Sequence, residues 1–481
     1  MVQCSFYDLL SRYDKIFKVY KFLEGRVIVN KHLYRKYVAS ALAIILFFSG
    51  FAGVHKAHAE AALNVNADGA ILVDGKTGKV LYEKNADSVL GIASMTKMMT
   101  EYILLDSVKK GKVKWDQEYR VSDLVYKISQ RRDLSNVPLR ADGTYKVREL
   151  YQAMAIYSAN AATIALAEIM GGSETNFVKM MNAKAKELGL KDYKFVNSTG
   201  LNNRDYKGLQ PQGTGAEDEN VMSSRAVAKL AFHLINDFPD VLKTASTPKK
   251  VFREGTSDQI NMINWNWMLP SLDYGYQGMD GLKTGTTDFA GYCFTGTASR
   301  DGKRFITVVQ NAKDDTGQQG GYKARFEETR KMMDYAFSNY TNVKLVPQHY
   351  QVKGQKTLPV LKGKADQVKI YTKSAINMTV LNGEEKNYQP VLVLDKNKAS
   401  KNGELTAPIK KGEKIGYVML KPKNGEKVSF LTTEGQKKAQ VDVVAAEDVE
   451  RANWFVLMMR GIGNFFGDVF HGIGTTVKGW F

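Results

Sequence analysis

The sequence predicts an α+β domain with helices packed on a mainly antiparallel sheet, then a small all-β sandwich and a C-terminal amphipathic helix. Three observations support this prediction. Alternating apolar runs lie near both ends of residues 60–340, with helical periods between them. Residues 341–446 hold short β-rich runs separated by Asn-Gly turns. Residues 447–481 return to a helical period.

Residues 1–59 are predicted to be a secretory signal with a long n-region. Basic residues precede an uncharged apolar run at 38–54, and Ala57-His58-Ala59 follows it. A positive segment, an apolar segment and an A-x-A site are typical of a signal peptide, so we expect cleavage after Ala59. An uncleaved membrane anchor is the alternative. Both interpretations place the rest of the chain outside the cytoplasm.

The formal net charge of +18 is not concentrated in a basic run with interleaved aromatic residues. This bias suits a polyanionic cell envelope better than sequence-specific nucleic-acid binding, and we expect no nucleic-acid partner. The two cysteines are Cys4 and Cys293. Because Cys4 lies in the predicted signal, the mature chain has no internal disulfide. We interpret Cys293 as a buried small hydrophobe.

Residues 60–340 begin with a predicted β-hairpin, in which apolar runs at 70–73 and 79–82 flank a Gly-containing turn. A helix follows directly and begins near Ser94. Arg300-Asp301-Gly302 is a second hairpin signal, between the last two strands. The other expected elements are helices over 147–154, 161–170, 175–188 and 223–237, strands over 279–287, 290–298 and 305–310, and a closing helix over 324–340.

Residues 341–446 contain no long helical period. The pairs Asn382-Gly383, Asn402-Gly403 and Asn424-Gly425 separate short β-rich runs. About a hundred residues of this kind predict a small β-sandwich or barrel. The expected strands cover 367–371, 378–381, 390–394, 415–420, 428–431 and 439–444.

Residues 447–481 are predicted to form an amphipathic helix that lies in the interface of a membrane. Apolar side chains recur every three or four residues, and polar or charged ones fall on the opposite face. Trp454, Trp480 and Phe481 add bulky interfacial anchors, whereas the interspersed charges argue against a spanning helix. A helix docked on the protein's own core is the alternative.

Ser94-Met95-Thr96-Lys97 places a serine and a lysine three residues apart at an expected helix start. On a helix these two side chains lie on the same side, so the amine can reach the hydroxyl. A serine is a poor nucleophile at its free pKa, and a neighbouring buried lysine is one way to activate it. The same spacing recurs at Ser107 and Ser246, so the motif alone is weak.

Two further motifs complete a candidate serine acyl-transfer site. Ser158-Ala159-Asn160 lies between two expected helices. Lys283-Thr284-Gly285 lies on an expected strand, where the glycine permits close approach of a ligand backbone. Decoys occur at Ser400-Lys401-Asn402 and at Lys76-Thr77-Gly78. Only the set at 94, 158 and 283 runs from helix start to inter-helix loop to strand within one domain.

Ser-x-x-Lys, Ser-Asp-Asn (here Ser-Ala-Asn) and Lys-Thr-Gly form the motif set of β-lactamases and penicillin-binding proteins. The surrounding stretches Gly91–Thr100, Asn197–Leu201, Gly281–Gly285 and Ala290–Phe294 resemble those of D-alanyl-D-alanine carboxypeptidases, the low-molecular-mass penicillin-binding proteins. The resemblance runs from about Ala61 to the end of the chain and departs from the family in the long N-terminus. It implies a β-lactamase/transpeptidase-like fold for residues 60–340.

The resemblance implies a serine-type carboxypeptidase that removes the terminal D-alanine from peptidoglycan stem pentapeptides and is acylated by β-lactams. It makes Ser94 the nucleophile and Lys97 its base, which must be partly neutral. Ser158 would relay a proton to the leaving amine, and Asn160 would bind the substrate amide. No cofactor is implied, and the histidines show no metal-like spacing.

On the predicted strand, the resemblance assigns Lys283 to the terminal carboxylate region of the substrate and Thr284 to a hydrogen bond with it. The backbone N–H groups of Ser94 and Thr286 would form an oxyanion hole, worth roughly 3 kcal/mol per donor. Arg325, at the last helix of the domain, is similar in placement to a carboxylate-binding arginine of the family.

Three local alternatives remain open. Ser158 and Asn160 also suit the capping of a helix that begins at Ala161. Lys283 also suits an edge-strand charge that deters aggregation. Asn197–Leu201 also suits a plain turn.

Two other functions remain open as well. A class A β-lactamase needs a deacylating glutamate in a Glu-x-x-Leu-Asn stretch, and none occurs between 158 and 283. We therefore expect slow deacylation of penicillin. A non-catalytic module that senses β-lactams or binds the cell wall is the second alternative, and the complete motif set argues against it.

Overall fold

The computed structural model describes residues 63–460 and 462. These residues belong to one compact unit. The predicted signal at 1–59 and most of the predicted helix at 447–481 lie outside the described residues. Within the described part of the chain, no helix is long and apolar enough to cross a membrane.

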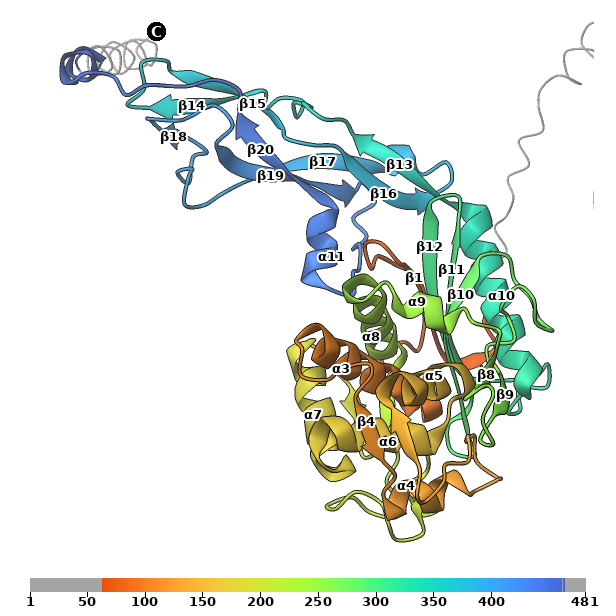
Figure 1. The fold of residues 1–481 in the computed structure, drawn as a ribbon. Coiled ribbons are helices and arrows are strands. Elements are labelled where there is room, and N and C mark those ends of the chain that lie inside the picture. Colours follow the sequence, from red (N-terminus) through yellow and green to blue (C-terminus); the bar gives the residue numbers. More distant parts are fainter. Residues whose placement is uncertain (1–62, 461, 463–481) are drawn as a thin grey trace, which may run out of the picture. The chain divides into compact units, whose positions relative to one another are not determined.

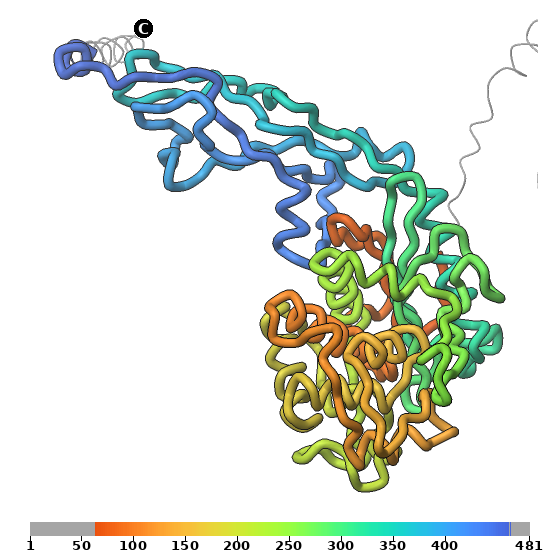
Figure 2. Tube along the Cα trace, in the orientation of Figure 1, coloured from red at the N-terminus to blue at the C-terminus, as the bar shows by residue number. Residues whose placement is uncertain are grey.

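A five-stranded antiparallel sheet forms the centre of the first domain, in the order β10-β11-β12-β1-β2 (Figure 1). β1 pairs with β12, with Ala67 opposite Ala312, so the first and the last strand of this sheet in chain order lie side by side (Figure 2). The sheet confirms the predicted hairpin and the three predicted strands. Its members are β1 Ala67–Asp74, β2 Val80–Lys84, β10 Met279–Thr287, β11 Gly291–Arg300 and β12 Lys303–Ala312.

Helices cover both faces of this sheet. In β1, Ile71 and Val73 enter one apolar core with α8, whereas Ala70 and Leu72 enter another with α10, because successive strand residues point to opposite faces. The helices are α3 Lys97–Lys109, α4 Asp123–Ser129, α5 Val147–Tyr157, α6 Asn160–Gly171, α7 Glu174–Glu187, α8 Ser224–Asp237, α9 Val241–Ala245 and α10 Tyr322–Asn339.

A third apolar core lies among α4, α5 and α6, and α3 contributes to it. Met98 and Met99 of α3 belong to the core beneath the sheet, whereas Leu104 belongs to this helical core. The helix that follows Ser94 is therefore buried between two packed layers. Short strands complete the domain: β3 Val89–Gly91, β4 Glu118–Arg120, β5 Thr144–Lys146, β6 Tyr193–Lys194, β7 Val221–Ser223, β8 Lys249–Phe252 and β9 Ile260–Ile263.

The β-rich region begins with β13, where the chain leaves α10. It holds a six-stranded sheet in the order β17-β19-β20-β15-β14-β18 and the separate pair β13-β16. Five of the six expected strands are present. The strands are β13 Tyr340–Val346, β14 Thr357–Leu361, β15 Gln367–Thr372, β16 Ile376–Leu381, β17 Tyr388–Leu394, β18 Leu405–Thr406, β19 Lys414–Pro422 and β20 Gln440–Ala445.

The strand expected over 428–431 is wrong. Its backbone binds the first domain instead of the β-rich sheet, since Val80 N donates to Ser429 O and Leu431 N donates to Gly78 O. A short helix that the sequence pattern does not predict, α11 at Thr433–Lys438, follows directly.

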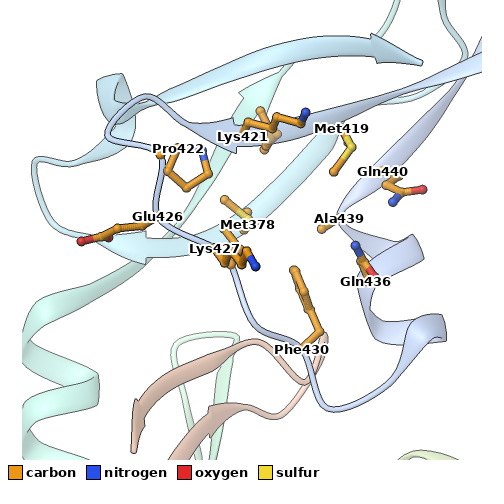
Figure 3. A pocket seen from close by; sticks show the side chains of 13 residues that line it. Met378, Met419, Lys421, Pro422, Glu426, Lys427, Phe430, Gln436, Ala439 and Gln440 are labelled. Atoms are coloured by element: carbon orange, nitrogen blue, oxygen red, sulfur yellow. The ribbon is translucent and has the colours of Figure 1, made fainter. Parts of the chain in front are cut away.

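A cavity of about 350 Å³ lies between β16, β19, the irregular segment 425–430 and α11. Figure 3 shows Met378, Met419 and Phe430 around it, with α11 at one side. No predicted site residue lines this cavity.

Of the predicted helix at 447–481, residues 447–460 and 462 are described, and the helix begins only at Trp454. The predicted start at 447 is wrong, because the preceding residues pair with the β-rich region, Val449 with Ile409 and Arg451 with Gly363. Trp454 is 74 % exposed and Met459 is 50 % exposed. Arg460 holds the helix to the β-rich region, because Nη1 donates to Gly363 O at 2.8 Å and pairs with Asp366 at the same distance. The described part of the helix thus presents its apolar side chains to solvent.

Candidate active site

Ser94 and Lys97 lie where two helices join. The 3₁₀ helix η1 spans Ala93–Thr96 and continues into α3 at Lys97. Lys97 Nζ is 2.8 Å from Ser94 Oγ. The residues that set the helical period, Met95, Met98 and Met99, are all buried, and this anchoring determines which face of α3 presents Lys97.

Three oxygen atoms surround the amine of Lys97, whose side chain is buried. Nζ donates to Asn160 Oδ1 at 2.8 Å and to the Thr199 carbonyl at 2.7 Å, and Ser94 Oγ is the third neighbour. A neutral amine has two N–H bonds and one lone pair. Because the amide oxygen and the carbonyl can only accept, the lone pair of a neutral Lys97 faces the Ser94 hydroxyl.

The environment of Lys97 favours this neutral form. Burial, in the first place, and the charge of Lys283 lower its pKa well below the usual lysine range, while Glu174 acts in the opposite direction. A free amine beside the hydroxyl is what a general base for a serine requires.

Ser158 and Asn160 lie at the break between α5 and α6. Ser158 is buried and ends α5 in the left-handed region, at φ 58. Asn160 is the first residue of α6, and its Nδ2 donates to Ser135 O at 3.1 Å, which turns its oxygen toward Lys97. The capping alternative is wrong, because the N-cap of α6 is Ala159 and the first-turn Ala161 N donates to Asn136 Oδ1, not to Ser158 or Asn160.

Lys283, Thr284 and Gly285 lie on β10, the edge strand beside η1. A Cβ atom on Gly285 would lie 2.6 Å from Ile92 O and 3.1 Å from Ser94 N. The glycine therefore lets this strand approach the backbone of the nucleophile more closely than any other residue would permit.

Lys283 is 5 % exposed, so the alternative of a solvent-facing edge charge is wrong. Its Nζ donates to the Thr284 carbonyl at 3.0 Å. Burial, and then the charge of Arg325, lower the pKa of Lys283 to about 7, while Glu101 acts in the opposite direction. An anion bound beside Lys283 would restore its charged form.

Arg325 lies in the first turn of α10 and is buried. Its Nη1 donates to Thr286 Oγ1 at 2.8 Å and to Gly285 O at 3.2 Å. Tyr322 and Phe326 pack against the guanidinium at 5.1 and 4.9 Å, and burial lowers its pKa to about 10. Sequence placement and geometry thus bring this arginine to the end of the Lys283 strand.

The segment Asn197–Leu201 is part of the site, and the plain-turn alternative is wrong. Thr199 supplies the carbonyl that binds Lys97. Gly200 has φ 80, and a Cβ atom there would lie 1.8 Å from Ala93 O, against the backbone of the nucleophile. The sequence indicated this segment only through its resemblance to the family. It did not indicate the carbonyl contact, because that contact depends on packing between segments about a hundred positions apart.

Among the described residues, the hydrogen-bond partner of the Ser94 hydroxyl is a buried lysine amine and not a histidine. This pair, set between an α-helical layer and the edge of an antiparallel sheet, is typical of a serine-type acyl-transfer hydrolase.

A model of the family Peptidase S11, D-alanyl-D-alanine carboxypeptidase, matches residues 55–314. A second model, the C-terminal domain of penicillin-binding protein 5, matches residues 340–451. The chain belongs to the D-alanyl-D-alanine carboxypeptidase family and is a serine-type carboxypeptidase. The predicted family, fold class and enzyme class are confirmed.

Relatives match over most of their length. The chain is 32 % identical over 399 residues to D-alanyl-D-alanine carboxypeptidase DacF of Bacillus subtilis, covering 83 % of this chain and 90 % of the relative. It is 30 % identical to DacC of Escherichia coli, covering 79 % and 85 %. The solved structure of a peptidoglycan synthesis regulatory factor (PBP3) from Streptococcus pneumoniae superposes with a TM-score of 0.65 at 33 % identity, covering 80 % of this chain and 99 % of that one.

Proposed function

We propose that the protein removes the terminal D-alanine of peptidoglycan stem pentapeptides through an acyl-enzyme on Ser94. Lys97 takes the hydroxyl proton as Ser94 Oγ attacks the carbonyl between the two terminal D-alanines. Ser158 passes a proton to the leaving amine, so D-alanine departs and an ester remains. Water then hydrolyses the ester and frees Ser94.

The observation that best supports this proposal is the set of three contacts at Lys97. Two acceptors, Asn160 and Thr199, take the N–H bonds of a neutral amine, and the remaining contact is the nucleophile itself. An ordinary surface pair of serine and lysine has neither the burial nor the two acceptors.

The terminal carboxylate of the substrate is proposed to bind at the Lys283 strand. Lys283 and Arg325 are both buried, and each has a pKa lowered mainly by burial. A substrate carboxylate would compensate these charges, and Thr284 would add a hydrogen bond. The N–H groups of Ser94 and Thr286 are proposed as the oxyanion hole, which the close packing of Gly285 on Ser94 N supports.

Release of D-alanine from diacetyl-Lys-D-Ala-D-Ala tests the proposal. We expect release by the wild-type protein and none above background by Ser94→Ala. Equal release by the variant would exclude Ser94 as the nucleophile.

Covalent reaction with β-lactams is proposed for the same serine. The chain is similar to penicillin-binding protein 5 of Haemophilus influenzae, with a TM-score of 0.62 at 26 % identity. Intact-mass measurement after benzylpenicillin should show a long-lived adduct that Ser94→Ala lacks. Rapid turnover of benzylpenicillin would favour the β-lactamase alternative instead.

We also propose that the protein is exported and that residues 447–481 hold it on the outer face of the cytoplasmic membrane. The exposed apolar side chains at 454–460 support an interfacial helix. Truncation after Ala452 is the appropriate test, because Val449 and Ala452 are buried in the β-rich region. The truncated enzyme should keep its activity and lose liposome binding; continued flotation with lipid would exclude this anchor.

A further inference from the structure

Glu174, at the start of α7, is a buried carboxylate outside the three motifs. Its Oε1 accepts three hydrogen bonds, from Ser198 N at 2.9 Å, Ser198 Oγ at 2.6 Å and Tyr206 OH at 2.8 Å. Its Oε2 is buried and meets no hydrogen-bond partner among the described residues. A buried carboxylate oxygen that accepts no hydrogen bond lowers the stability of the fold. A buried glutamate of this kind is therefore a candidate for a functional role.

The two residues that bind Glu174 hold Thr199 from both sides. Ser198 precedes it in the chain, and the Tyr206 hydroxyl is 3.1 Å from Thr199 Oγ1. Thr199 in turn offers its carbonyl to Lys97 at 2.7 Å. Glu174 is therefore connected to Thr199 in two ways, through the neighbouring residue Ser198 and through the Tyr206 hydroxyl. The Thr199 carbonyl is the acceptor that orients Lys97.

We propose that Glu174 is a positioning residue for acylation, which aims the Lys97 lone pair at Ser94 by holding the Thr199 carbonyl and which places a negative charge behind the base. It touches neither Ser94 nor Lys97 in the hydrogen-bond network, so it acts through the segment that it holds. This inference rests on the proposed role of Lys97 as the base.

The charge of Glu174 gives a direction that can be measured. The charged groups that face Lys97 are Lys283 on β10, which lowers its pKa, and Glu174 on α7, which raises it. The groups that face Glu174 are Tyr206 and, on α6, Glu168. Removing the Glu174 charge lowers the pKa of Lys97 further, so the free amine then persists to lower pH.

Glu174→Gln is the main test, and its readout is the pH profile of the second-order rate of acylation by benzylpenicillin. We expect the plateau to fall about tenfold or more, because the carbonyl is held less firmly, and the acid limb to move to lower pH. Glu174→Asp keeps the charge and should return the limb to its wild-type position even if the plateau stays low. A merely structural role would lower the plateau and leave the limb in place, and that result would overturn the proposal.

Glu168→Gln is the matched control. Glu168 also accepts hydrogen bonds from a tyrosine and a serine hydroxyl, Tyr119 and Ser122, but these residues do not bind Thr199. Because loss of the Glu168 charge lowers the pKa of Glu174, we expect the acid limb of Glu168→Gln to stay at the wild-type position or to move slightly to higher pH, opposite to Glu174→Gln. An equal shift in this control would mean that the effect is not specific to Glu174.

Tyr206→Phe covers the case in which Glu174→Gln does not fold. It removes one of the three donors that stabilise the ionised carboxylate, so the acid limb should shift in the same direction by a smaller amount. The segment retains its other support, since Asn197 Oδ1 accepts from Thr199 N and Gly200 N. An unmoved limb in this variant would also overturn the proposal, whereas acylation that survives Ser94→Ala would instead refute the proposed function.

Discussion

The tripeptide Lys-Thr-Gly occurs twice in this chain, and its two copies lie in opposite surroundings. Lys76-Thr77-Gly78 forms the turn between β1 and β2, whereas Lys283-Thr284-Gly285 lies within β10. Lys76 is exposed and Lys283 is buried. The surroundings of the three residues, and not their order, decide whether the lysine can take part in chemistry.

The copy at Lys76-Thr77-Gly78, called the turn copy below, is folded around Asp74. Asp74 Oδ1 accepts from Lys76 N at 3.1 Å and from both Thr77 N and Thr77 Oγ1 at 2.7 Å. This Asx-type turn uses the threonine as a structural donor. Gly78 has φ 70, and its carbonyl accepts from Leu431 N. The turn copy therefore joins the catalytic sheet to the β-rich region.

The largest expected difference in activity is between substitutions of the two glycines, Gly285 and Gly78. Gly285→Ala brings a Cβ atom to 2.6 Å from Ile92 O and pushes β10 away from Ser94. We expect the rate of D-alanine release to fall more than about 100-fold, since small misplacements of reacting groups cost that much. Gly78→Ala should cost roughly 1–2 kcal/mol of stability through its left-handed backbone and leave the rate intact. Similar rates for both variants would contradict the comparison.

Substitutions of the two lysines should differ less in activity than those of the glycines, and this difference should depend on pH. Lys283→Ala removes a charge-assisted contact with the substrate carboxylate, so we expect kcat/KM to fall about 10- to 100-fold. Because the pKa of Lys283 is about 7 in the free enzyme, the affinity of the wild type for carboxylate-bearing ligands should weaken as pH rises above 7. Lys76→Ala should match the wild type throughout. If Lys76→Ala lost the pH dependence of ligand affinity, that dependence would belong to Lys76 and not to Lys283.

Motif and periodicity were sufficient to predict most of this molecule. The Ser94 helix, the five-stranded sheet and five β-rich strands follow from local apolar patterns. The order of Ser94, Ser158 and Lys283 then separated the candidate site from the decoy motifs, because only these three fall on a helix start, a loop and a strand of one domain.

The remaining features depend on contacts between distant segments. Thr199 binds Lys97 through a carbonyl, which every residue type has, so no residue pattern marks it. Glu174 resembles any acidic residue at a helix start. The segment 428–431 reads as a strand because it is apolar, but its partner is the turn at Gly78 in the other domain.

Lys79, directly after the turn copy, tests whether that region is structural. Its Nζ donates to Thr379 O at 2.9 Å and to Tyr388 OH at 3.1 Å, and burial lowers its pKa to about 8. Between pH 8 and 10.5 the unfolded chain holds a proton that the folded chain has lost, so stability rises with pH in this window. From pH 8 to 9 the wild type should gain about 1 kcal/mol relative to Lys79→Met.

Chemical denaturation of the wild type and Lys79→Met across this pH range measures that difference. Lys84→Met is a suitable control, because its amine binds Val65 O within the first domain and away from the turn. Parallel curves for the wild type and Lys79→Met would show that Lys79 keeps its charge in the folded protein.

The two threonines give the smallest effects and separate stability from catalysis most cleanly. Thr77→Val keeps the side-chain shape but removes the donor to Asp74, so unfolding should become easier by about 1 kcal/mol while D-alanine release is unchanged. Thr284→Val removes a hydroxyl that no described element of the fold uses as a hydrogen-bond donor, so it should reduce kcat/KM by up to about tenfold with little change in stability. Denaturation midpoints and peptide hydrolysis on the same samples measure both quantities. If Thr77→Val slowed hydrolysis, the turn would have to influence Ser94 through the sheet, and the two copies would not be independent.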